Sequence, residues 1–281
     1  MRIVGSKSGQ VWVTSPDGDG WSLAESDALA AALAAGDPGR LLEAAVEARD
    51  DDPEAAAVLA PPLRPGKVVA IGLNYLDHVR ETGMDAPSSP LVFAKFPSSV
   101  IGAGEAIVID PEVTRRVDWE AELGVVIGRP ASRVSVERAL DHVFGYTVGN
   151  DVSARDVQFG DVQWVRGKSL DTFCPLGPAL VTTDEIPDPQ ALAIATYVND
   201  EKVQDSNTSE MVFGVAELIS FCSKSFRLEP GDVLLTGTPW GCGEFMDPKR
   251  SLLAGDVVRC EVASIGSLAN PVVERPAEPA T

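Results

Sequence analysis

Two glutamates separated by a single residue, Glu120 and Glu122, are the first residues of this chain whose spacing indicates chemistry. The stretch from Val117 to Ile127 has strand character, so both carboxylates are expected on one face of a β-strand. The strand continues with apolar residues, which predicts burial, and burying two unpaired carboxylates side by side is costly. A bound cation would relieve this repulsion, whereas a solvated strand face is the alternative.

Asp151 offers a third carboxylate of the same kind. It follows an apolar strand, Phe144 to Val148, and strand ends are where loops present functional groups. With the two glutamates it would complete a site made only of oxygen ligands, which favours Mg²⁺, Mn²⁺ or Ca²⁺ over Zn²⁺. The alternative for Asp151 is an Asx turn that caps a following helix.

His78 and Glu81 are spaced so that both side chains lie on one face of a helical turn. A carboxylate bound to an imidazole fixes its tautomer and raises its basicity, as a general base requires. An exposed helix pair is the alternative. The surrounding segment, residues 75–90, has the composition of a mobile lid that is poorly ordered without ligand and closes over it.

Lys168 lies beside a glycine among apolar residues, where it could hold an oxyanion or a carboxylate, although the motif alone says little. The glycine-rich segment Thr236–Gly243 matches neither a dinucleotide-binding motif nor a P-loop, and a tight loop at a strand end is expected there. The four cysteines are scattered without a CxxC pair, so we expect core residues in a reducing, cytoplasmic environment.

The bulk properties exclude several classes of protein. The chain has 281 residues and a net charge of −19, which argues against binding nucleic acid or an anionic membrane surface. It does not exclude an anionic substrate, because a metal and a few buried cations can dominate one cleft. No apolar stretch is long enough for a membrane helix, and the N-terminus lacks the features of a secretory signal.

Two regions with different composition follow each other along the chain. A hairpin is expected over residues 1–23, then an alanine-rich segment with helices over 27–34 and 41–48, then a proline-rich linker. We therefore predict a small N-terminal α+β domain over residues 1–65 and a metal-binding catalytic domain over 66–281. The second region is rich in irregularly spaced strands, which favours a mixed sheet roll or barrel over a doubly wound fold. The expected strands cover 67–71, 105–109, 120–127, 144–150, 179–182, 194–198, 232–236 and 257–262, and the expected helices cover 75–82, 136–142 and 209–223.

Six ordered motifs carry a family resemblance. GLNYLDHVRE, DWEAELGVVIG, YTVGNDVSARDVQ, RGKSLDTFCPLGP, QDSNTSEM and EPGDVLLTGTP occur in the order seen in the fumarylacetoacetate hydrolase family, which this chain resembles from about Lys67 to Val272. The resemblance implies a β-rich α+β fold, a mixed β-sandwich roll or barrel of that family's C-terminal type. It also implies the site residues: metal ligands Glu120, Glu122 and Asp151; catalytic residues His78, Glu81 and Lys168; substrate-binding residues Arg155, Gln158, Thr238 and Lys95.

The chain is most similar to the short branch of that family, with three carboxylates, which includes acylpyruvases, oxaloacetate decarboxylases and isomerase/decarboxylases of homoprotocatechuate breakdown. This resemblance predicts a hydrolase, dependent on Mg²⁺ or Mn²⁺ (Ca²⁺ can take this place in a crystal), that cleaves a C–C bond of a 2,4-dioxo acid by way of an enolate. The alternatives are an isomerase of the 2-hydroxyhepta-2,4-diene-1,7-dioate type or a 2-oxo acid decarboxylase and, more distantly, a non-catalytic binding protein. The expected partners are a small anionic 2-oxo acid and a second copy of the chain in a homodimer.

Overall fold

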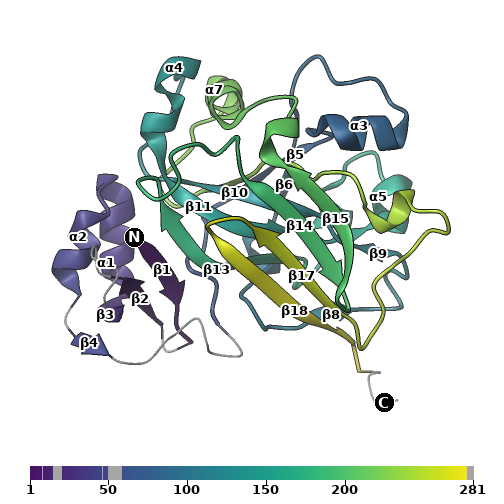
Figure 1. The fold of residues 1–281 in the computed structure, drawn as a ribbon, viewed down its shortest axis with the longest axis horizontal. Helices are drawn as coiled ribbons and strands as arrows, with labels where there is room; N and C mark the ends of the chain where they lie inside the picture. The colour runs from purple at the N-terminus through teal and green to yellow at the C-terminus, as the bar shows by residue number, and fades with distance from the viewer. Residues whose placement is uncertain (8, 15–20, 46, 50–58, 277–281) are drawn as a thin grey trace.

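Two open β-sheets that share a core form the body of the protein. The computed structural model describes residues 1–7, 9–14, 21–45, 47–49 and 59–276 (Figure 1). The larger sheet has the strand order β4-β3-β2-β1-β13-β11-β10-β16-β5-β6, with β7 pairing beside β13. Its strands are β1 Arg2–Gly5, β2 Gln10–Thr14, β3 Trp21–Glu25, β4 Glu47–Arg49, β5 Val68–Gly72, β6 Leu91–Lys95, β7 Val100–Ile101, β10 Ala121–Ile127, β11 Val143–Asn150, β13 Cys174–Thr182 and β16 Val233–Leu235.

The second sheet has five strands in the order β15-β14-β17-β18-β8. They are β8 Ile107–Ile109, β14 Ala193–Val198, β15 Glu201–Asn207, β17 Val257–Val262 and β18 Gly266–Glu274, and a separate pair is formed by β9 Val117–Asp118 and β12 Ser153–Ala154. One apolar cluster contains side chains from both sheets, such as Leu123 of β10, Val148 of β11 and Val258 of β17. The β-rich α+β class expected from the sequence is therefore confirmed, with sheets that remain open.

The central strands of the larger sheet are buried along their whole length. All residues of β10 and β11 are buried, and the two strands pair antiparallel. A continuous buried run of this kind is what strands covered on both faces show. These two strands matter most for function, because Glu122 lies within β10 and Asp151 comes directly after β11.

The helices lie around the sheets. They are α1 Ser26–Ala35, α2 Gly39–Ala44, α3 Leu76–Thr82, α4 Val136–Ala139, α5 Arg155–Gly160, α6 Val165–Lys168 and α7 Val215–Ser225, with 3₁₀ turns η2 Pro97–Ser99, η3 Leu140–His142, η4 Thr208–Glu210 and η5 Gly243–Phe245. Helix α3 and the short helix α5 lie at the opposite end of the molecule from the N-terminal strands (Figure 1).

Several sequence expectations need correction. The helix expected over 41–48 ends at Ala44, and Glu47–Arg49 instead pairs with β3, so strand pairing overrides helical composition there. The helix expected from 209 begins at Val215, because Thr208–Glu210 forms a 3₁₀ turn. Strands β6, β15 and β18 and helices α5 and α6 had no clear signal in the sequence.

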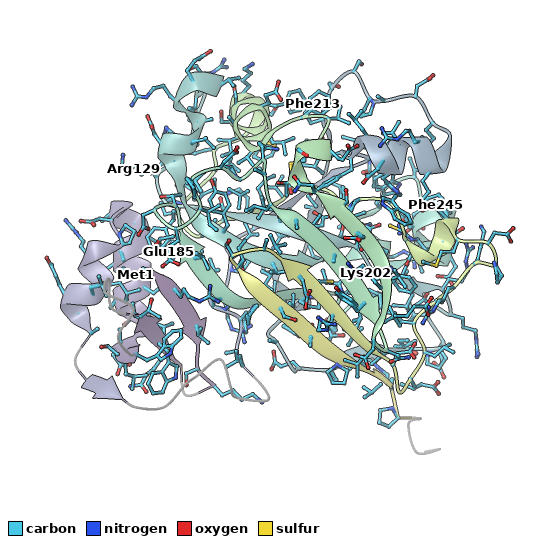
Figure 2. The ribbon with its side chains drawn as sticks, viewed as in Figure 1. Met1, Arg129, Glu185, Lys202, Phe213 and Phe245 are labelled. Carbon is cyan, nitrogen blue, oxygen red and sulfur yellow. The ribbon has the colours of Figure 1, made fainter. Side chains whose placement is uncertain are left out.

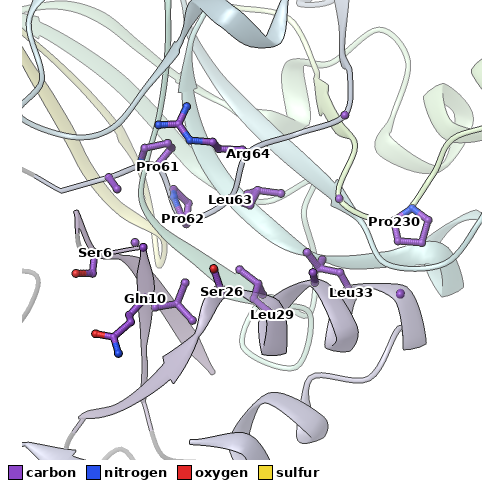
Figure 3. Close-up of a pocket in the computed structure, with 18 residues that line it drawn as sticks. Ser6, Gln10, Ser26, Leu29, Leu33, Pro61, Pro62, Leu63, Arg64 and Pro230 are labelled. Carbon is purple, nitrogen blue, oxygen red and sulfur yellow. The ribbon is translucent and has the colours of Figure 1, made fainter.

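The N-terminal strands join the larger sheet instead of standing apart. Strand β1 pairs antiparallel with β13, with Ile3 opposite Leu180, and with β2, which confirms the expected hairpin. A cavity of about 460 Å³ lies where this region meets the body, between α1 and the segment Pro61–Leu63 (Figure 3). The domain division at residue 65 stays a prediction.

Candidate active site

Three buried carboxylates converge at one end of strands β10 and β11. Glu120, Glu122 and Asp151 each offer an oxygen, and these oxygens lie within 4.8 Å of one another. The pairing of Ala121 with Asn150 brings the strand ends together, and Asp151 N donates to Glu120 O at 2.9 Å. All three are at most 6% exposed, so the burial expected from the apolar strand is found.

Three cations surround this cluster and balance most of its charge. Lys168 Nζ bridges Glu120 Oε2 at 2.7 Å and Asp151 Oδ2 at 2.8 Å. Lys95 Nζ contacts the other carboxylate oxygen of Asp151, Oδ1, at 2.6 Å. Arg155 contacts Glu120 Oε1 at 2.7 Å. Burial opposes ionisation of Glu120, but Lys168 and Arg155 outweigh it and lower the pKa of Glu120 to about 2.

Glu122 is the carboxylate left without a cation. Within the part of the chain that the structure describes it forms no ion pair, and it accepts only a hydrogen bond from Gly237 N at 2.7 Å. Burial, and then the charges of Asp151 and Glu120, raise the pKa of Glu122 well above its usual range. A hard divalent cation coordinated by Glu120, Glu122 and Asp151 would remove this repulsion, so the donor set fits such an ion.

A histidine–glutamate pair is carried by α3. His78 Nδ1 lies 2.8 Å from Glu81 Oε2, and both side chains are largely buried, which excludes the exposed pair considered above. With Nδ1–H donating to the carboxylate, Nε2 keeps its lone pair and can act as a base. Phe245 packs edge-on against the imidazole at 5.2 Å between ring centroids and lies beside α3 (Figure 2).

The loop from Thr236 to Phe245 connects these groups. Gly237 N donates to Glu122, and Gly241 N donates to Glu81 Oε1 at 2.9 Å. Gly241 has φ +96°, and a Cβ there would lie 2.0 Å from Val203 O, so only glycine permits this approach. The sequence predicts a tight loop at a strand end here, and the structure adds that its backbone amides hold site carboxylates.

A pocket of about 150 Å³ opens between the carboxylates and α3. Its polar lining comes from Glu120, Arg155, Gln158, Lys168, Thr238 and His78, and its apolar lining includes Phe93, Trp164, Met84, Leu91, Phe159 and Phe245. Charged and apolar side chains lie side by side in this wall: Lys168 Nζ is 5.3 Å from the Phe93 ring centroid, and Arg155 Cζ is 5.9 Å from that of Phe245. Apolar walls with a few polar groups are typical of a small-molecule site.

The structure brings together most of the residues singled out in the sequence. Arg155, Gln158, Lys168 and Thr238 line the pocket as expected. Lys95 is placed differently: its side chain is fully buried against Asp151 and is not among the pocket-lining residues, so it balances charge behind the site.

Other functional residues went unnoticed in the sequence. Asp118 binds Arg155 Nε at 2.8 Å and accepts hydrogen bonds from Gly243 N and Glu244 N, so it orients the arginine. The sequence offered one signal for Asp118: it lies two residues before Glu120, in the same DWEAE motif.

Buried carboxylates that face a paired imidazole across a pocket are the arrangement of an enzyme active site. Comparison with known proteins agrees with this class. The family model for the fumarylacetoacetate hydrolase C-terminal domain matches residues 67–273. The chain belongs to the fumarylacetoacetate hydrolase family and is an enzyme of that family.

Similar proteins include two oxaloacetate tautomerases named as mitochondrial. The one from Xenopus laevis is 52% identical over 77% of this chain and 68% of its own length. The human FAHD2A protein is 48% identical over 76% of this chain and 69% of its own length.

Solved structures of the family are also similar. The fumarylacetoacetate hydrolase of Exiguobacterium antarcticum superposes with a TM-score of 0.85 at 35% identity, covering 97% of this chain and 98% of the other. The 2-hydroxyhepta-2,4-diene-1,7-dioate isomerase of Mycobacterium marinum gives 0.72 at 33% identity, covering 99% and 100%. Among the described residues, no helix is long and apolar enough to cross a membrane.

Proposed function

We propose that this enzyme transfers a proton beside the carbonyl of a small 2-oxo acid, interconverting the keto and enol forms of oxaloacetate or a close analogue. The observation that carries the proposal is the His78–Glu81 pair, whose imidazole lines the same small pocket as Glu120 of the carboxylate cluster. The names of the two relatives described above, both oxaloacetate tautomerases, support the same reaction.

The residues of the site would have different roles in the proton transfer. His78 Nε2 would take the proton from the carbon next to the carbonyl and return it to the oxygen of the resulting enolate, giving the enol. Glu81 would stabilise the imidazolium formed in between. Lys168 would stabilise the developing negative charge on that oxygen, and Arg155 with Gln158 would hold a carboxylate. Mg²⁺ or Mn²⁺ on the three carboxylates would supply Lewis-acid polarisation of the carbonyl when bound.

The size of the pocket favours a small substrate. Its volume is about 150 Å³, whereas sites for drug-sized ligands are roughly 300–1,000 Å³. A four-carbon dicarboxylate suits this space better than a long acylpyruvate or a seven-carbon dienedioate.

Hydrolysis of a 2,4-dioxo acid is the second candidate, and the apolar residues that line the pocket favour it. Phe93, Trp164 and Met84 would accommodate an acyl group that carries no charge. His78 would then deprotonate water instead of carbon, and the hydroxide would attack the carbonyl of the acyl group. The C–C bond would break to give a carboxylic acid and the enolate of pyruvate, which a proton from the imidazolium converts to pyruvate. Decarboxylation of oxaloacetate would instead release CO₂ and leave the enolate of pyruvate, which takes up a proton, with no attack by water.

One product assay separates these reactions. The purified protein would be given enol oxaloacetate, and its ultraviolet absorbance and NMR spectrum followed with Mg²⁺, with Mn²⁺ and with a chelator. We expect metal-dependent loss of enol absorbance faster than in buffer, without pyruvate. Pyruvate and CO₂ from oxaloacetate would instead indicate a decarboxylase, and pyruvate with a carboxylic acid from an acylpyruvate would indicate a hydrolase. The homodimer stays a prediction, which light scattering tests.

A further inference from the structure

Gln204 of β15 is a fully buried amide whose motif, QDSNTSEM, has no role in the chemistry described so far. It belongs to the second sheet, yet its side chain reaches two parts of the pocket built on the first. The hydrogen-bonding atoms of this one side chain connect the strand of the carboxylates with the loop that begins at Thr236.

The oxygen end of Gln204 holds the strand of the carboxylates. Oε1 accepts from Ala121 N at 3.1 Å and from Thr196 Oγ1 at 2.6 Å. Ala121 lies between Glu120 and Glu122, so this bond fixes the backbone that carries both glutamates.

The nitrogen end holds the loop. Nε2 donates to Thr238 Oγ1 and to Pro239 O, each at 2.9 Å. The orientation of the amide is unambiguous, because Ala121 N is only a donor and Pro239 O only an acceptor.

This orientation decides what the Thr238 hydroxyl can do. Since the hydroxyl oxygen already accepts a bond from Nε2, its own hydrogen remains to be donated. Within the described residues the structure gives that hydrogen no acceptor, and Thr238 lines the pocket. A hydroxyl held in this way is a donor for an anionic ligand oxygen.

We propose that Gln204 is a positioning residue that commits the Thr238 hydroxyl to donate to a substrate carboxylate and fixes its distance from Glu120 and Glu122. The proposal rests on the proposed function for the kind of substrate, a small 2-oxo acid. Its side chain bonds to residues 121, 196, 238 and 239, with longer contacts to Trp240 O at 3.3 Å and Cys242 Sγ at 3.8 Å, so Gln204 acts on the substrate only through these neighbours.

The test is a double-mutant cycle of Gln204→Met and Thr238→Val, with binding of oxalate in the presence of Mn²⁺ measured by calorimetry. Oxalate is a planar mimic of a 2-oxo acid enolate and needs no turnover. If the protein binds oxalate but does not act on oxaloacetate, the proposed function is wrong, and the role of Gln204 can still be measured. Gln190→Met is the matched control, because Gln190 also bonds through both ends of its amide, to Val215 N and Thr208 O, away from the pocket.

Loss of a hydrogen bond to a charged oxygen predicts that Gln204→Met weakens oxalate binding about 10- to 100-fold, and that Thr238→Val does the same. In the Thr238→Val background, where the hydroxyl is already absent, Gln204→Met should weaken oxalate binding by less than about threefold. With an active substrate KM should rise while kcat stays within about threefold, because the bond exists in ground and transition states alike.

The proposal is overturned if the double variant loses oxalate affinity by the product of the two single losses, because the two residues would then act independently. It is also overturned if Gln204→Met weakens oxalate binding no more than Gln190→Met does. If Gln204→Met does not fold, Gln204→Glu keeps the acceptor for Ala121 N, and the same cycle is run. The charge that it adds would weaken oxalate binding equally with and without the Thr238 hydroxyl. A larger loss in the presence of the Thr238 hydroxyl than in Thr238→Val therefore supports the proposal, and equal losses in the two backgrounds overturn it.

Discussion

The cavity beside α1 and the pocket under α3 lie at opposite ends of the molecule and differ in the charge of the residues that line them. The cavity beside α1 is the larger, about 460 Å³, and Arg64, which is exposed, is the charged residue among those that line it (Figure 3). The pocket under α3 is about 150 Å³, yet Glu120, Arg155 and Lys168 are all nearly fully buried in its wall.

This difference shows that buried charge, and not volume, marks the place of the chemistry. Burying an ion costs several kcal/mol unless a partner offsets it, so a fold that keeps several buried ions close together has a use for them. The larger cavity is lined mainly by apolar residues and glycines, with a few uncharged polar side chains and the exposed Arg64, so it holds no buried charge to explain. The following predictions test this contrast, from the largest expected effect on activity to the smallest.

Glu122→Gln should have the largest effect. It removes the charge of the one carboxylate in the cluster that has no cation, so a divalent ion would bind more weakly and turnover should fall roughly 10³-fold or more. Calorimetry with Mn²⁺ and steady-state kinetics check this. Unchanged Mn²⁺ affinity would remove Glu122 from the proposed ligand set.

His78→Ala should lower turnover by roughly 10²–10⁴-fold and leave Mn²⁺ affinity unchanged. Glu81→Gln should cost less, because an amide oxygen still accepts the imidazole N–H without contributing charge. Arg80→Ala is the control on the same helix, since Arg80 is exposed and pairs with Glu210 at the surface. Losses from His78→Ala as small as those of the control would exclude the general base.

Lys168→Ala should lower kcat by roughly 10²–10³-fold if its ammonium stabilises an oxyanion. Burial favours the neutral amine, but Asp151 and Glu120 outweigh it and raise the pKa of Lys168, so the charge persists at neutral pH. Arg166→Ala on the same helix, an exposed pair with Asp161, is the control. A raised KM with unchanged kcat would limit Lys168 to binding.

Leu29→Ala, at the larger cavity, should have the smallest effect on activity. Leu29 is buried, so the substitution should lower the free energy of unfolding by about 2–5 kcal/mol, measured by urea denaturation. At a temperature where the variant is folded, kcat/KM should stay within about twofold of the unsubstituted protein. A large loss of activity would mean that the two ends of the molecule are coupled.

The sequence predicted the β-rich class and the clustering of the three carboxylates, but it did not predict every strand around them. ExE on an apolar strand, with an aspartate after the next strand, predicts a buried carboxylate cluster because strand alternation and pairing are local rules. Strand β15 escaped notice because EKVQDSN is polar and lacks alternation, and it lies at a sheet edge where pairing, not hydrophobic pattern, defines the strand. The contacts of Gln204 and of the amides of Gly237 and Gly241 join segments that are far apart in the sequence, so no local pattern predicts them.

The backbone pairing of β1 with β13 has a consequence for where the chain can be divided. Val181, Leu180 and Ala179 of β13 lie opposite Arg2, Ile3 and Val4 of β1. A chain cut at residue 66, where the family match begins, would expose the hydrogen-bonding groups of an apolar strand. Such an open edge invites pairing with other molecules and aggregation. We therefore expect the N-terminal strands to protect this sheet edge from self-association, although they contribute none of the residues that line the pocket under α3.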